Sequence, residues 1–153
     1  MATSALPTVI STLVTTFKAA SSLTGVRIYD GIEIDLSYPG DMIAVGHDGN
    51  LDSDEVSAGS IRQRYENLGA RNKMENGVVN CVLWSQSGIT DLSALRTKAF
   101  STLGNIETII RTDASLGSVV IYADLDQGQM TYIQSPAGAG VQITFSISYT
   151  VKI

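Results

Sequence analysis

The end of the chain carries the feature that most constrains its fold. Apolar side chains occupy every odd position from Val141 to Ile153, and polar side chains occupy every even position between them. Alternation with a period of two indicates a β-strand that is buried on one face only. Such a strand would run roughly 43 Å at ~3.3 Å per residue, about twice the usual length. We therefore expect part of it to project beyond the domain or to join the sheet of a neighbouring copy.

Two segments have the period of a helix. Apolar residues recur at spacings of three and four over residues 4–23, with Ser4 or Thr3 available to cap the start and Gly25 following the end. The second segment, residues 90–112, has the same period, with Thr90 as the expected N-cap.

The remaining ordered segments indicate strands: residues 26–30, 42–47, 61–68, 78–86, 119–126, 129–135 and 141–153. Asn76-Gly77 lies near the end of a turn-rich stretch, 69–77, and predicts a long antiparallel hairpin between its flanking strands. Asp126-Gln127-Gly128 predicts a second turn. This order predicts one domain, residues 1–153, of the α+β class: a mainly antiparallel (mixed) sheet with two helices on one face and a long β-hairpin.

Charge is distributed unevenly along the middle of the chain. Residues 41–55 contain five acidic side chains and no Lys or Arg, whereas residues 61–75 contain four basic and two acidic side chains. The net charge of −5 argues against tight binding to duplex nucleic acid, which needs clustered Lys and Arg. Such stretches either face water or meet a patch of opposite charge on another subunit, and contacts of the second kind close into rings when the rotation fits.

The residue types that catalysis and metal binding require are scarce. The chain has one His, His47, and one Cys, Cys81, and it lacks a nucleophile elbow and a phosphate-binding glycine loop. Asp48 to Glu55 resembles the start of a calcium loop, but Ser53 and Gly59 replace the Gly and Glu that such a loop needs. We expect Cys81 to be a small buried hydrophobic residue. We predict no enzyme activity, no metal and no cofactor.

The sequence gives no sign of export or membrane insertion. The first residues lack a positively charged and then apolar signal segment, and no apolar run approaches the ~20 residues that span a bilayer. We expect a protein made inside the cell, with no membrane partner.

With these elements in order, the whole chain resembles the tail terminator (tail completion) proteins of long-tailed bacteriophages, the lambda-type family. The resemblance lies in the opening helix that ends near Gly25, the acidic loop, the hairpin 61–86 and the helix end Ile106 to Asp113. It continues in Ser135-Pro136-Ala137-Gly138-Ala139-Gly140, which precedes the last strand.

The resemblance implies a structural virion protein at the head-proximal end of the tail. Copies would form a hexameric ring that ends polymerisation of the tail tube, contacts the tube protein, docks onto the head–tail connector or neck protein, and lets DNA pass without specific binding. The family provides no catalytic residues to transfer. The alternatives are another phage connector, neck or minor tail protein, or a monomeric ligand-binding or enzymatic α+β domain.

We assign the charged residues from their chemistry. The expected contacts to a neighbouring subunit or to the tube are the four basic residues Arg62, Arg64, Arg71 and Lys73. The acidic residues either meet these basic groups or line the lumen, where they would keep DNA from adhering. They are Asp48, Asp52, Asp54 and Glu55.

Overall fold

The computed structural model describes residues 3–32, 34, 35, 37, 40–66, 72–86, 91–135 and 138–153. Within these residues two α-helices pack on a mixed, mostly antiparallel sheet of six strands, which confirms the predicted α+β class. The helices and strands, with one short 3-10 helix (η1), are α1 (Leu6–Ala19), η1 (Ser21–Leu23), β1 (Arg27–Asp30), β2 (Asp41–Val45), β3 (Gly59–Tyr65), β4 (Lys73–Gln86), α2 (Leu92–Thr112), β5 (Tyr122–Ser135) and β6 (Gly138–Lys152).

The sheet is organised around β4. The strand order is β1-β2-β4-β6-β5, and β3 pairs with β4 off this path. One edge of β4 is shared, because Cys81–Ser85 pair with β2 and Lys73–Val79 pair with β3. Only β1 and β2 are parallel; the other described pairs are antiparallel. β1, β3 and β5 each have one strand neighbour within the described sheet, and the outer edge of β5 is partly covered, because the N–H of Ala123 donates to the carbonyl oxygen of Ala114 at 2.8 Å.

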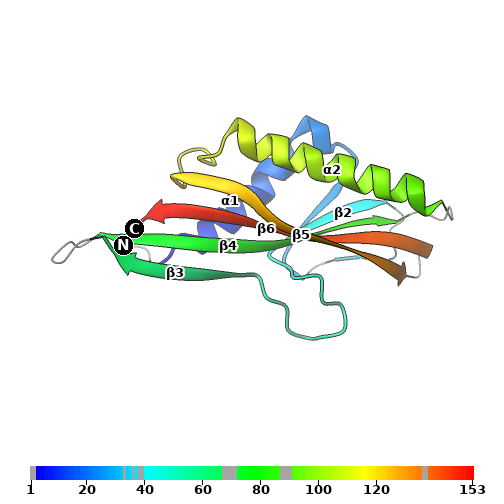
Figure 1. Cartoon of the computed structure of the whole chain (residues 1–153), viewed down its shortest axis with the longest axis horizontal. Helices are drawn as coiled ribbons and strands as arrows, with labels where there is room; N and C mark the ends of the chain where they lie inside the picture. Colours follow the sequence, from blue (N-terminus) through cyan, green and yellow to red (C-terminus); the bar gives the residue numbers. More distant parts are fainter. Residues whose placement is uncertain are drawn as a thin grey trace.

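Both helices cover the same face of the sheet, which we call the helical face (Figure 1). Leu13 and Phe17 from α1 and Ile106 and Ile110 from α2 are buried in one core together with the odd-numbered apolar residues of β6. Burying a Leu or Ile side chain fully stabilises a fold by about 1.5–3 kcal/mol. The prediction of two helices on one face is thus confirmed.

The opposite face, which we call the open face, has a smaller apolar cluster around Trp84. The loop of residues 46–58, between β2 and β3, lies on this side and forms the lowest part of the molecule in Figure 1. Elsewhere the open face is polar, because the even-numbered residues of β6 are Gln, Thr, Ser and Lys.

The prediction of a turn at Asp126-Gln127-Gly128 is wrong. β5 is one strand, and its register against β6 changes from Leu125 opposite Ile147 to Gly128 opposite Phe145. The strand therefore contains one extra residue, which is a β-bulge rather than a turn.

The hairpin of β3 and β4 is confirmed, but the position of its turn is not. β4 begins at Lys73, so Asn76-Gly77 lies inside a strand instead of ending the turn. Gly77 is needed there for space, because a Cβ atom at this position would lie 2.2 Å from Cζ of Tyr149 on β6. The glycine of Asn76-Gly77 therefore reflects a close approach between β4 and β6, and not a turn.

The long last strand does not project from the domain. β6 pairs with β4 over Gly140–Lys152 and with β5 over Gly138–Thr150, so both of its edges are covered. Its length is matched by two neighbours of 14 residues each, which is why the expectation of a projecting end fails.

The helix ends differ slightly from the prediction. α1 begins at Leu6, whose N–H donates to Oγ of Ser4 at 3.1 Å, and η1 replaces the last predicted turn. The N-cap of α2 is Asp91, which accepts from the N–H of Ala94. The predicted cap, Thr90, lies outside the described residues.

Candidate functional site

The predicted basic residues do not form one cluster. Arg62 and Arg64 are exposed on the open face of β3. Lys73 lies on the helical face, where its Nζ is 5.3 Å from the centre of the Tyr65 ring, a cation–π contact. Arg71 lies outside the described residues. The structure thus brings together Arg62 and Arg64 and separates Lys73 from them.

The acidic residues share one loop but differ in their contacts. The carboxylate of Asp48 accepts hydrogen bonds from the N–H groups of Asn50 at 2.9 Å and of Ser57 at 3.0 Å, and so closes the base of the loop. Burial opposes ionisation of Asp48, yet these hydrogen bonds hold its pKa below the usual value. Asp48 is therefore a structural residue of the loop.

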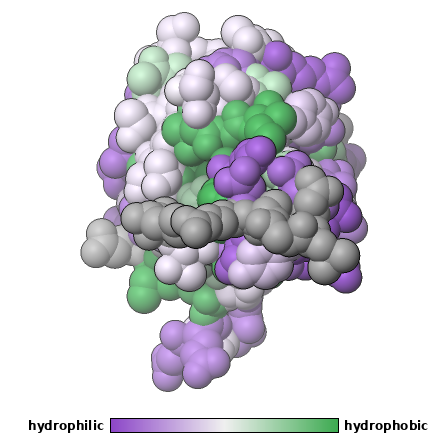
Figure 2. Space-filling model, turned by 90° about the vertical axis from the view of Figure 1, so that its left-hand side faces the viewer, coloured by the Kyte–Doolittle hydropathy of each residue, from purple (hydrophilic) through white to green (hydrophobic). Residues whose placement is uncertain are grey.

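The other three acidic side chains are exposed at the end of the loop. The carboxylates of Asp52, Asp54 and Glu55 form no hydrogen bond or ion pair with any described residue. In the end-on view of Figure 2 the lowest part of the molecule, which this loop forms, is hydrophilic. These three groups are available for contacts outside the chain.

His47 anchors the loop to the sheet. Its ring is buried, and its Nδ1 accepts a hydrogen bond from the N–H of Gly49 at 2.8 Å. The ring also packs edge-on against Trp84, with 5.5 Å between centroids. Burial lowers the pKa of His47, against the opposing effect of the Asp48 carboxylate, and so favours the neutral ring that can accept this bond.

A second anchor joins the loop to β6. Nε1 of Trp84 donates to Oε1 of Gln142 at 2.7 Å, and Nε2 of Gln142 donates to the carbonyl oxygen of Gly49 at 3.2 Å. A Cβ at position 49 would lie 2.6 Å from Gln142 and from Thr144, and the φ of Gly49 is +81°. Only glycine fits this close approach without strain.

The acidic loop and the arginines of β3 do not neutralise each other. The ion pairs among the described residues are Lys98–Asp41 at 3.7 Å, Arg111–Glu107 at 2.7 Å and Lys152–Glu66 at 3.3 Å. None of them joins the loop to Arg62 or Arg64. Two sets of opposite charge are thus held apart on one chain.

Two hollows of the open face lie beside the charged residues. A hollow of 410 Å³ is lined by Arg62 and Asn76 at one side and by Tyr122 and Thr150 at the other. A second hollow, of 540 Å³, lies between Asp48 and the β5 bulge. Amide and hydroxyl groups that can form hydrogen bonds contribute to the lining of both hollows.

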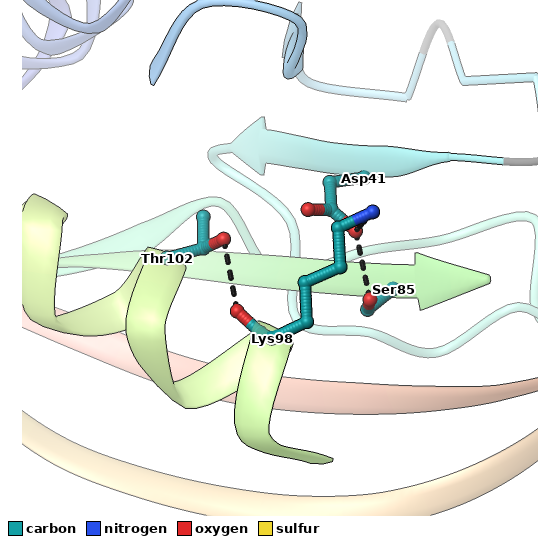
Figure 3. A network of polar contacts seen from close by, with 4 residues as sticks. All are labelled: Asp41, Ser85, Lys98 and Thr102. Atoms are coloured by element: carbon teal, nitrogen blue, oxygen red, sulfur yellow. Dashed lines mark hydrogen bonds and ion pairs between the residues drawn. The ribbon is translucent and has the colours of Figure 1, made fainter. Parts of the chain in front are cut away.

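Asp41 belongs to the acidic stretch in the sequence but lies away from the loop. Its carboxylate is buried, accepts a hydrogen bond from Oγ of Ser85 at 2.7 Å, and pairs with Lys98 of α2 (Figure 3). In the same view Thr102 donates to the carbonyl oxygen of Lys98. Asp41 and Lys98 border a third hollow, of 650 Å³, between η1, β2 and α2. Nothing in the sequence links these distant positions.

Glu75 is a buried site that sequence analysis missed. Its Oε1 accepts from Oγ of Ser4 at 3.0 Å, the N–H of Ala5 at 3.1 Å and the hydroxyl of Tyr149 at 2.8 Å, and its Oε2 accepts from Nε2 of Gln63 at 2.6 Å. Burial opposes its ionisation, but the four donors together hold its pKa below the usual value. Glu75 joins the start of α1 to β3, β4 and β6.

Cys81 is fully buried, as predicted, and burial raises the pKa of its thiol to about 12. Across the described residues there is no group of three or more His, Cys, Asp or Glu side chains suited to a metal ion. No described helix combines the length and the apolar character needed to cross a membrane.

No model of a protein family matches this chain, and no curated protein matches its sequence significantly.

Proposed function

We propose that this protein is a structural subunit of the tail of a long-tailed bacteriophage. Copies form a ring at the head-proximal end of the tail tube, end the polymerisation of the tube protein, and dock onto the connector or neck protein. In this proposal the chain converts no substrate and needs no cofactor.

The observation that carries the proposal is the separation of opposite charges on two different parts of one chain. Arg62 and Arg64 lie on a strand, and Asp52, Asp54 and Glu55 lie on a loop anchored by His47 and Gln142. Because neither set is neutralised within the described chain, each is available to other molecules. Complementary patches at different places on identical subunits form heterologous contacts, which close into rings.

The acidic loop has two roles open to it in such a ring. It meets basic groups of a neighbouring copy, or it lines the lumen and repels the phosphates of passing DNA. The position of the loop on the hollowed open face, away from the helices, favours the second role.

Disrupting the gene in the phage that encodes this protein tests the proposal. We expect tails of uncontrolled length that do not join heads, and we expect purified protein added to a lysate of the mutant to restore head joining. Normal-length tails joined to heads in the absence of the protein would overturn the proposal.

A further inference from the structure

We infer that the outer edge of β3 is a site of strand addition for the tube protein. An extended segment of that protein, with acidic side chains at alternate positions, lies antiparallel to Ile61–Tyr65 and places its carboxylates opposite Arg62 and Arg64. This inference rests on the proposed function, and it selects the tube from the two partners expected for these arginines. β3 has one strand neighbour, β4, in the described sheet and is the outermost strand on its side (Figure 1).

The backbone of β3 presents hydrogen-bonding groups on its outer edge. The N–H of Asn80 on β4 donates to the carbonyl oxygen of Ala58, just before β3, at 2.9 Å, and the ladder continues from there without a change of register. Because bonding directions alternate along an antiparallel ladder, the even-numbered residues of β3 face β4. The N–H and C=O groups of Ile61, Gln63 and Tyr65 therefore face away from the sheet, and no described residue forms a hydrogen bond with them.

The open face of this edge is positively charged. Arg62 and Arg64 are both exposed there, and no described carboxylate forms an ion pair with either of them. Side chains directly opposed on neighbouring strands lie about 4.5–5.5 Å apart at Cβ, and opposite charges at such positions stabilise the pairing. Two acidic residues separated by one residue on an added strand match the spacing of the two arginines.

The helical face of the same edge is apolar and accessible. Ile61 is 43% exposed and Tyr65 is 64% exposed. Residues of an added strand that lie opposite these two positions would cover them best if they were apolar. The edge therefore fits a five-residue segment that is apolar at its first and last positions and acidic at its second and fourth positions. In strand addition the main chain provides affinity, and such alternating side chains provide specificity.

The middle of the edge is held in place by its own chain. Nε2 of Gln63 donates to the carbonyl oxygen of Thr3 at 2.7 Å and to Oε2 of Glu75 at 2.6 Å. These bonds fix the side chain on the helical face and tie β3 to the start of the chain. An edge that is already ordered loses less conformational entropy when a partner binds.

A second copy of the chain offers no matching strand at the positions considered. On the other side of the sheet, the N–H of Ala123 on β5 already donates to the carbonyl oxygen of Ala114 at 2.8 Å. In the acidic loop, the N–H groups of Asp52, Glu55 and Ser57 are bonded to side chains of the loop itself. Neither segment is therefore a free strand.

Two β3 edges do not suit each other either. A two-fold axis at Gln63, the middle of the edge, would place Arg62 of each copy opposite Arg64 of the other. Like charges that are directly opposed destabilise strand pairing. The edge therefore suits an acidic segment of a different protein, and the tube is the partner that the proposed function supplies.

Binding of synthetic peptides tests the site without the phage. The probe is the peptide Thr-Val-Glu-Thr-Glu-Val-Thr, blocked at both ends, titrated into isotope-labelled protein and followed by NMR. We expect the largest shift changes at the amides of Ile61, Gln63 and Tyr65, and at least tenfold weaker binding of the control peptide Thr-Val-Lys-Thr-Lys-Val-Thr. Failure of the glutamate peptide to bind would overturn the inference and leave the arginines as charges that keep other strands away from the edge.

Methylated peptides distinguish strand addition from a contact between charges alone. In the antiparallel register the N–H groups of the two valines face β3, whereas those of the two glutamates face away. N-methylation of the valines should abolish binding, and N-methylation of the glutamates should weaken it less than threefold. Equal effects of the two modifications would contradict strand addition.

Charge reversal in the protein tests the role of the arginines. Arg62→Glu should weaken binding of the glutamate peptide at least fivefold. Lys18→Glu is the matched control, because it makes the same change of charge at an exposed position on α1, and it should change the affinity less than twofold. Equal weakening by both variants would show that only net charge matters and would overturn the site.

Photo-cross-linking identifies the partner. A photoreactive phenylalanine in place of Tyr65 is introduced, the protein is added to purified tail tubes, and the adducts are identified by mass. We expect an adduct with the tube protein. An adduct between two copies, binding to tubes without an adduct, or no binding to tubes would each overturn the inference. The gene disruption then decides separately whether the tail function stands.

Discussion

The hydroxyl of Tyr149 donates a hydrogen bond to Oε1 of Glu75 at 2.8 Å across the space that a side chain at position 77 would fill. Burial and the neighbouring carboxylate both raise the pKa of Tyr149, so the hydroxyl stays protonated and remains a donor. This contact ties β6 to β4 beneath the start of α1. It also links a glycine, a buried charge and a helix start in one arrangement that mutations can test.

Gly77→Ala should destabilise the fold by about 2–5 kcal/mol, because the new methyl group displaces the Tyr149 ring and leaves Glu75 with a donor missing. The free energy of unfolding, measured with urea, checks this. Gly104→Ala is the matched control: nothing lies within 4 Å of its Cβ in α2, so it should stabilise by up to about 1 kcal/mol. Equal effects of the two substitutions would contradict the account of Gly77.

Glu75→Gln should lower the free energy of unfolding by about 1–3 kcal/mol. The NH₂ group that replaces one carboxylate oxygen cannot accept the hydrogen bonds that this oxygen accepted. The pH dependence should change as well. Since the folded state lowers the pKa of Glu75, its contribution to stability is present above about pH 4.5 and is lost as the pH falls below that value. The free energy of unfolding should therefore change less between pH 3 and 6 in the Glu75→Gln variant than in the natural protein.

His47 should produce a second loss of stability at higher pH. Its pKa is lowered in the folded state, so the unfolded chain binds the proton more readily, and stability falls as the pH drops below about 6.5. Protonation of Nδ1 removes the acceptor for the Gly49 N–H. Hydrogen exchange of the Gly49 amide should therefore be faster below this pH than the intrinsic pH dependence of amide exchange predicts. The variant His47→Asn should lack this transition while keeping the one due to Glu75.

Neutralising the end of the loop should leave the monomer intact. The triple variant Asp52→Asn/Asp54→Asn/Glu55→Gln should unfold within about 0.5 kcal/mol of the natural protein, because these side chains are exposed. If the loop lines the lumen, the triple variant should still form rings, but DNA should leave the particles more slowly because the repulsion of its phosphates is lost. Loss of ring formation in this variant would assign the loop to contacts between copies instead. Asp48→Asn is the contrasting change and should destabilise, because Asp48 closes the loop.

Replacing both arginines of β3 tests the charge requirement for assembly. Arg62→Glu/Arg64→Glu should leave the unfolding transition of the single chain nearly unchanged, since both side chains are exposed and pair with no described carboxylate. It should abolish ring formation on tail tubes, as measured by co-sedimentation with purified tubes. Binding equal to that of the natural protein would remove these arginines from the interface.

The sequence predicted those parts of the fold that local pattern determines. The alternation of Val141 to Ile153 predicted β6, and the helical periods predicted α1 and α2 to within a few residues at most ends. It failed where a local signal has a tertiary cause. Gly77 resembles a turn residue because the ring of Tyr149 needs its space, and Gly128 follows a bulge that a single sequence does not distinguish from a turn.

The candidate site divides in the same way. The charged groups Arg62, Arg64, Asp52, Asp54 and Glu55 were visible as a charge pattern, and the structure describes them as exposed. The anchoring groups were not visible, because their partners come from distant strands. Gln142 reaches Gly49 across the open face, and Glu75 accepts hydrogen bonds from three separate segments.

A cryo-electron microscopy map of complete phage particles tests the central claim most directly. The account predicts a ring of this chain between the tail tube and the neck, with the loop of residues 46–58 directed toward the channel. A map in which this chain is absent from that junction, or occupies it as isolated copies without mutual contact, would contradict the account.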